Sequence, residues 1–426
     1  MNIFLKQNVS FLVVIALIIV SPVAARAENS KKSVESLTDL IDEAIAANDH
    51  IAAAHSKWKA AEYNIKYVKG MPDPQAQYGY FFDNVETRVG PQEHRYNISQ
   101  KIPFLGKLIT QGKIQAKQAE ALQAEYEATK REMIKKMKML YYDMYWIEKA
   151  VQITEQEKNV VAAVENVAEK KYETNQVPQQ DVMRAQLELS RLLDKLLQFK
   201  QNRKTLEAKM NNLLERALGS SIAIEENIEL PLFEYDLDNL RILGRQSKQE
   251  LLAAKVAVEK AEFEKTLATL NYIPDVTVGF DYVQVDSGHT TMPNDGADAY
   301  AGTVAVNIPL WFGKLHAKVQ EKKELLNARV KDTKDVEDDI MYEIEDLYYK
   351  IITYKNIIAL YQSALIPQSN QAVEAARVGY ETESVNFIDW LNSERVLLET
   401  RLAYYKTIVD YMKSIAFLER IIGKDL

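Results

Sequence analysis

The spacing of hydrophobic residues changes twice along each half of the chain. It follows a helical period of about 3.6 up to a Pro-Asp pair and then a strand period of about two. The alternation predicts strands at 75–83, 94–102, 276–285 and 300–308. Beyond a second proline the helical period returns, and it predicts long helices at 108–174, 180–218, 315–382 and 388–422.

The two halves share one order of elements. Pro103 and Pro309, which close the second strand of each half, lie 206 positions apart. We interpret residues 28–230 and 231–426 as two structural repeats, each a helix, a strand hairpin and a long helical hairpin. Polar loops at 84–93 and 286–299 are expected to join the paired strands. The predicted fold class is mainly α with a small β part.

Apolar residues in the returning helices follow steps of three and four, which average 3.5 and favour coiled-coil packing over an ordinary amphipathic helix. They are Val182, Ala185, Leu189, Leu192, Leu196 and Phe199 in the first half, and Ile388, Leu391, Leu398, Leu402, Tyr405, Val409 and Met412 in the second. Pro367 is expected to kink the helix at 315–382.

The first 27 residues are typical of a secretory signal peptide. Lys6 precedes the apolar run 11–20, and Ala25-Arg26-Ala27 forms a cleavage site. The apolar run is shorter than the roughly 20 residues that a membrane-spanning helix needs. We therefore expect cleavage after Ala27 and export from the cytoplasm.

Composition then excludes several classes of function. The net charge of −8 disfavours nucleic acid as a partner. The chain has no cysteine, which excludes disulfides, thiolate metal sites and a lipidated cysteine. Its five histidines are scattered, and the acidic run 334–349 is typical of a solvated helix face. We expect no cofactor, no metal site and no enzymatic activity.

Strands of nine or ten residues have the length of tilted transmembrane strands. Four strands cannot close a barrel, and an open edge in lipid would leave backbone groups unpaired. If these strands enter a membrane, several copies of the chain must complete one barrel together. A soluble sandwich would show the same alternation. The residues between the apolar positions are polar or small, as a water-filled lumen requires: Thr277, Gly279, Asp281, Thr303, Ala305 and Asn307.

Each strand-to-helix joint carries a proline, aromatic residues, a glycine and a lysine. We expect the prolines to end the sheet pairing, the aromatics to lie at the membrane boundary, the glycines to let the backbone turn into a helix, and the lysines to reach water or headgroups. One extra residue in the second joint predicts a different angle. The residues are Pro103, Phe104, Gly106 and Lys107 in the first joint, and Pro309, Trp311, Phe312, Gly313 and Lys314 in the second.

This order of elements resembles the TolC-like family of outer-membrane efflux channels, over essentially the whole chain after residue 27. The turn of each helical hairpin carries a related phrase, "KYETNQVPQQDVMRAQ" at 171–186 and "GYETESVNFIDWLNSE" at 379–394. Both phrases are similar to the family pattern Arg-Tyr-x-x-Gly-x-x-x-x-x-Asp-Val-Leu.

Four positions match this family pattern, and two positions differ from it. Tyr172 and Tyr380 match the tyrosine of the pattern, and Asp181 and Asp389 match its aspartate. At the glycine of the tip turns the chain has two other residues, Asn175 and Glu383.

The resemblance implies a homotrimer. Its twelve strands would form one barrel in the outer membrane of a Gram-negative bacterium, and its twelve helices would continue it as a tunnel through the periplasm. The implied partners are outer-membrane lipid, a periplasmic adaptor (membrane fusion) protein and an inner-membrane pump of RND or ABC type. The implied function is the exit duct of a tripartite efflux or secretion system.

The resemblance also implies roles for residues at the tip. Asp389 would contribute to an acidic pore constriction, and Asn392 occupies a position where some relatives carry a second aspartate. Asp181 and Tyr380 match positions that close the tip through a hydrogen bond, and an arginine that assists in some relatives falls on Val385. Capping of the returning helix by Asp389 is an alternative role for that residue.

A second class of function stays open from the sequence. A secreted coiled-coil protein could space or tether the cell envelope without conducting anything. The duplicated strand pairs count against it, because a spacer does not need them.

Overall fold

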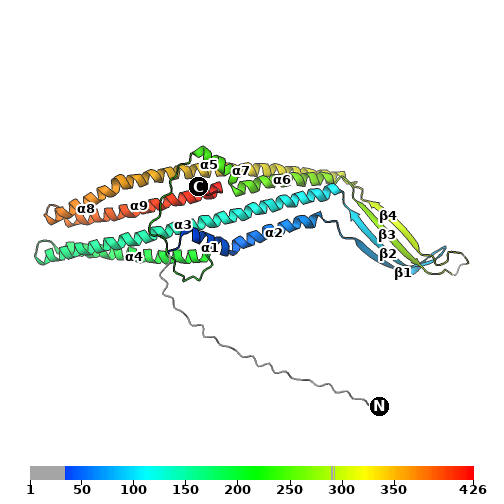
Figure 1. Ribbon diagram of the computed structural model, residues 1–426, viewed down its shortest axis with the longest axis horizontal. Coiled ribbons are helices and arrows are strands. Elements are labelled where there is room, and N and C mark those ends of the chain that lie inside the picture. The colour runs from blue at the N-terminus through cyan, green and yellow to red at the C-terminus, as the bar shows by residue number, and fades with distance from the viewer. Residues whose placement is uncertain (1–33, 289–290, 292) are drawn as a thin grey trace, which may run out of the picture.

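The chain forms an elongated molecule with a four-stranded sheet at one end and the turns of two helical hairpins at the other (Figure 1). The computed structural model describes residues 34–288, 291 and 293–426. The expected signal peptide, residues 1–27, lies outside the described residues.

Both halves of the chain follow the same order of elements. The first half contains α1 (Leu37–Ala47), α2 (Asp49–Lys69), β1 (Gln75–Thr87), β2 (Gly90–Ile102), α3 (Leu105–Glu173) and α4 (Gln179–Leu213). The second contains α5 (Leu237–Ser247), α6 (Gln249–Leu270), β3 (Val276–Val285), β4 (Ala299–Val306), α7 (Phe312–Leu360), the π-helical turn η1 (Tyr361–Leu365), α8 (Ile366–Glu381) and α9 (Phe387–Ile422). None of the helices in the described ranges is both long enough and apolar enough to cross a membrane.

Several boundaries differ from the sequence prediction. Strands β1 and β2 continue to a tight turn at 88–89, so the loop expected at 84–93 is wrong. Each strand pair is preceded by two helices instead of one, because the chain leaves the helical conformation at Asn48 and at Lys248, where ψ is 117° in both. The Asn48 side chain caps α2 by accepting hydrogen bonds from two backbone N–H groups.

Pro367 does not break its helix. It lies in the first turn of α8, directly after the π-helical turn at 361–365. A π-turn widens the helix and can accommodate a proline ring that would clash with the preceding turn of a regular α-helix. The helical path from α7 to α8 is therefore continuous.

The sheet is antiparallel in the order β1-β2-β3-β4, so β1 and β4 are its edges. Between the helices and the register shifts at 80–85 and 92–94, even-numbered residues share one face of the sheet. Four tyrosines align there across all four strands: Tyr78, Tyr96, Tyr282 and Tyr300. Neighbouring ring centroids in this row are 5.3, 5.8 and 5.3 Å apart. This face is mainly apolar and lies largely exposed, including Phe280, Val304 and Val306.

The opposite face of the sheet carries the small and polar residues that the sequence placed there. Thr277, Gly279 and Asp281 alternate with the apolar residues of β3. The Asp281 carboxylate is buried and accepts a 2.7 Å hydrogen bond from Nη2 of Arg95 on β2. One face of the sheet is therefore apolar and the other hydrophilic.

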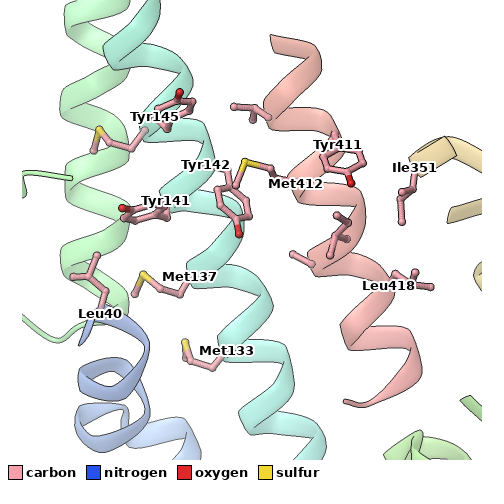
Figure 2. Packing of buried hydrophobic residues seen from close by; sticks show 14 of the residues in the cluster. Leu40, Met133, Met137, Tyr141, Tyr142, Tyr145, Ile351, Tyr411, Met412 and Leu418 are labelled. Carbon is pink, nitrogen blue, oxygen red and sulfur yellow. The ribbon is translucent and has the colours of Figure 1, made fainter. Parts of the chain in front are cut away.

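The largest hydrophobic core lies in the middle of the molecule, where α1, α3, α7 and α9 meet. Figure 2 shows methionines and tyrosines of α3 between Leu40 of α1 and the side chains of α9. Its labelled residues are Leu40, Met133, Met137, Tyr141, Tyr142, Tyr145, Ile351, Tyr411, Met412 and Leu418. A second core joins the two helical hairpins closer to their turns and includes Val182, Ala185, Leu192, Leu391 and Leu398 of the predicted seams.

Candidate functional site

The first strand-to-helix joint is organised around Asp275, which directly precedes β3. Its Oδ1 accepts hydrogen bonds from Nζ of Lys107 at 2.7 Å and from the backbone N–H of Phe104 at 3.1 Å. Its Oδ2 lies 3.2 Å from Nζ of Lys101, and its own N–H donates to the side chain of Asn307 beyond β4. Asp275 therefore ties the start of α3 to three of the four strands.

The roles predicted for Lys107 and Gly106 are wrong. Lys107 is buried, and its Nζ donates 2.7 Å hydrogen bonds to Asp275 and to the carbonyl of Ile273 instead of reaching water. Burial raises the pKa of Asp275, but the bonds from Lys107 and its other donors outweigh burial and hold the pKa below its usual value. Gly106 lies inside α3 without a positive φ, and a Cβ there would come within 2.6 Å of the Phe104 ring. A side chain at this position would have to displace the Phe104 ring.

The second joint is longer and more exposed. Residues 307–311 separate β4 from α7, whereas residues 103–104 suffice between β2 and α3. Trp311 is 79% exposed, and Phe312 stacks on Tyr272 with ring centroids 6.4 Å apart. Lys314 is exposed. Gly313 has no positive φ, and a Cβ added to it would meet nothing within 4 Å, so the joint needs no backbone freedom there either.

The turns of the two helical hairpins have the same backbone shape. Asn175 has a φ of 56° and Glu383 a φ of 62°. In each turn a threonine hydroxyl bonds a carbonyl four residues earlier, Thr174 to Lys170 and Thr382 to Val378. Left-handed backbone is strained for any residue with a Cβ and more so for glutamate than for asparagine.

We expect Glu383→Gly to stabilise the hairpin of α8 and α9 by about 1 kcal/mol, because glycine adopts a positive φ without steric cost. Urea unfolding followed by circular dichroism measures the change. Asn175→Gly is the matched control and should have a smaller effect. A destabilised Glu383→Gly protein would contradict the argument from strain.

Tyr380 and Asp181 are both buried close to the turns. The Tyr380 ring packs 5.2 Å from the ring of Trp390, and Nζ of Lys171 lies 4.5 Å from its centroid. Burial raises the pKa of the Tyr380 hydroxyl, and the nearby carboxylate of Asp181 raises it further. The hydrogen bond expected between these two residues is not formed, and the Tyr380 hydroxyl has no partner within the described part of the chain.

Asp389 and Asn392 lie exposed on one side of α9 in the single chain. Helix α9 is preceded by Asn386 at the N-cap position, so Asp389 is not the capping residue and lies in the first turn. A carboxylate in the first turn is favoured by the helix dipole. Burial is reversed between the two hairpins. The aspartate is buried in the first hairpin (Asp181) and exposed in the second (Asp389). The tyrosine is 41% exposed in the first hairpin (Tyr172) and 4% exposed in the second (Tyr380).

Three glutamates form a buried layer between the two helical hairpins, which the sequence analysis missed. They are Glu157 of α3, Glu188 of α4 and Glu394 of α9, and we call them the acidic layer. Glu188 accepts a 2.8 Å hydrogen bond from Nη2 of Arg395, and Glu394 accepts one of 3.1 Å from Nε1 of Trp390. Burial and the facing carboxylate of Glu394 raise the pKa of Glu157 to about 7.

No group of three or more histidine, aspartate or glutamate side chains in the described ranges is arranged to hold a metal ion.

A mainly helical chain with a small antiparallel sheet at one end defines a fold seen in outer-membrane channels. The crystal structure of CusC covers 92% of this chain and 93% of its own, with a TM-score of 0.77 and 14% identity. That of VceC from Vibrio cholerae covers 91% of this chain and 96% of its own, with a TM-score of 0.76 and 16% identity.

Comparison of sequences gives the family. The model of the outer membrane efflux protein family matches residues 40–216 and 243–424, and the chain belongs to this family. The outer membrane protein TolC of Vibrio cholerae is 22% identical over 72% of this chain and 71% of its own length. The cobalt-zinc-cadmium resistance protein CzcC of Cupriavidus metallidurans is 20% identical over 46% of this chain and 47% of its own length. The resemblance inferred from the sequence is confirmed.

Proposed function

We propose that three copies of this chain form one channel in the outer membrane of a Gram-negative bacterium. The observation that carries the proposal is the isolated sheet, which has one exposed apolar face, one hydrophilic face and two free edges. Free edges are costly in lipid because their backbone groups stay unpaired. Three copies supply twelve strands, which close a barrel wide enough to hold water.

The helical hairpins would continue this barrel as a tunnel in the periplasm. Helix α3 has 69 residues, which at about 1.5 Å per residue extend about 100 Å. The turns at its far end are then placed to meet a periplasmic adaptor protein and an inner-membrane pump of RND or ABC type. The chain would be exported by its signal peptide, stay unlipidated and act as the exit duct of a tripartite efflux or secretion system.

Oligomeric state and conductance test this proposal. Protein extracted from outer membranes in mild detergent should have the mass of three chains and should conduct ions in planar bilayers. A soluble periplasmic monomer without conductance would instead support a spacer or tether.

Asp389 is expected to make the channel prefer cations. Threefold symmetry would bring three exposed carboxylates together at the narrow end, where they attract cations. In single-channel recordings, Asp389→Asn should move the ratio of potassium to chloride permeability towards one. Asn392→Asp is the matched control and should raise that ratio. An unchanged ratio in Asp389→Asn would show that the constriction lies elsewhere.

A further inference from the structure

The two halves of the sheet follow one register. Pro72 and Pro274, which precede β1 and β3, lie 202 positions apart, and Pro103 and Pro309 lie 206 apart. Moving the β1–β2 pair Gln75 with Ser99 by these two offsets gives Thr277 with Ala305, which is an observed β3–β4 pair. The same offsets turn Tyr78 with Tyr96 into Phe280 with Gly302, which is also observed. Adding 202 to a β1 position and 206 to a β2 position therefore gives the structurally equivalent position in β3 or β4.

Only one of the two equivalent joints is complete within a single chain. Where β2 pairs with β3, Lys107 and Asp275 form a buried ion pair, with 10% and 11% of their side chains exposed. Lys107 is the third residue of α3, and Lys314 is the third residue of α7. The residue equivalent to Asp275 is Asp73, which follows Pro72 just before β1.

Lys314 and Asp73 are both exposed, and neither side chain takes part in a hydrogen bond or ion pair within the described ranges. Each lies beside a free edge of the sheet, Lys314 beyond β4 and Asp73 before β1. Their charges are opposite, and a single chain cannot bring them together because β2 and β3 lie between the two edges.

We infer that Lys314 of one chain binds Asp73 of the next copy, and that β4 pairs with the next copy's β1 with Val306 opposite Ala76. This inference rests on the proposed trimeric channel and gives its closing contact. The offsets fix the register of β4 against the next copy's β1. The observed β2–β3 pair is Gln100 with Val278. Adding 206 to the first position and subtracting 202 from the second gives Val306 with Ala76. Both residues then lie on the apolar face, as continuity of the sheet requires. Each chain supplies the lysine of one closing ion pair and the aspartate of another.

Disulfide trapping tests the register without background, because the chain has no cysteine. In Ala76→Cys with Val306→Cys, oxidation should link successive chains and give covalent dimers and trimers on a non-reducing gel. Gln100→Cys with Val278→Cys is the matched control inside one chain and should lose its free thiols without a change in mass. Ala76→Cys with Ala305→Cys places the second thiol on the opposite face and should stay monomeric on the gel.

Charge reversal tests the ion pair. Lys314→Glu alone and Asp73→Lys alone should each raise the monomer fraction of the detergent-extracted protein about tenfold at a fixed temperature, because each places like charges at the closing contact. The double variant Lys314→Glu with Asp73→Lys should restore most of the trimer.

The outcomes separate this inference from the proposed channel. A trimeric protein that links through Ala76→Cys with Val304→Cys in preference to Val306→Cys has another register, which overturns the inference and leaves the channel intact. Failure of the double charge reversal to restore the trimer overturns the ion pair. A wild-type protein that is monomeric in detergent overturns the proposed channel, and the inference falls with it.

Discussion

Asp275→Ala is expected to lower the free energy of unfolding by about 3–5 kcal/mol, because it leaves the ammonium group of Lys107 buried without its counter-charge. The variant also removes the acceptor for the backbone N–H of Phe104. Only the carbonyl of Ile273 would remain for Lys107. Urea unfolding of protein refolded in detergent, followed by circular dichroism, measures the loss.

A double variant separates the lost charge from the lost packing. Asp275→Leu with Lys107→Met replaces the ion pair by apolar groups of similar length, and such replacements are often close to neutral. It should recover most of the stability that Asp275→Ala loses.

The contribution of Asp275 to stability depends on pH. Since the folded-state pKa of Asp275 is lowered, this contribution is present above the ordinary pKa of about 4 and disappears as the pH falls below it. Equal unfolding midpoints for wild type and Asp275→Ala would show that the joint does not depend on this residue.

The sequence predicted the elements more completely than the contacts between them. Strand β3 was expected at 276–285 and lies at Val276–Val285, because its alternation is regular and a Pro-Asp pair marks its start. The ends of β1 and β2 were missed because the polar residues of 84–93 are typical of a loop, yet they pair across a two-residue turn. Local pattern does not report pairing partners.

The buried charges could not be predicted from the sequence, because local pattern does not indicate which distant residues come into contact. Lys107 and Asp275 are 168 positions apart, and each looks like an ordinary surface residue in its own segment. Glu157 lies in a helix rich in charge, so its position in the hydrophobic seam between Ile153 and Val161 carries no obvious signal. The turn residues Asn175 and Glu383 were found because the phrase around each turn resembles the family pattern, in which a glycine stands at that position.

Glu157→Gln is expected to remove a pH dependence from the contact between the two helical hairpins. Glu157 is 6% exposed, and its side chain takes part in none of the hydrogen bonds or ion pairs of the described ranges. Charged groups face it from both neighbouring elements, Glu188 of α4 and Glu394 and Arg401 of α9. Burial disfavours its charged form, and the two carboxylates disfavour it further.

The direction of the effect follows from proton binding. Unfolded glutamate loses its proton near pH 4.5, whereas folded Glu157 keeps it up to about 7. Between these values the folded state binds more protons, so stability falls as the pH rises, by at most about 3 kcal/mol in total. Because Glu157 belongs to α3 and Glu394 to α9, the loss should loosen the contact between the first hairpin and the second.

Hydrogen exchange of α3 and α9, measured from pH 5 to 8 and corrected for the intrinsic rate, tests this expectation. Wild-type protein should lose protection around the acidic layer as the pH rises, and Glu157→Gln should keep it, because glutamine stays neutral. Glu169→Gln, an exposed position on the same helix, is the control and should behave as wild type. If Glu157→Gln loses protection as steeply as wild type, then ionisation of Glu157 does not loosen the hairpins, and the acidic layer serves packing alone.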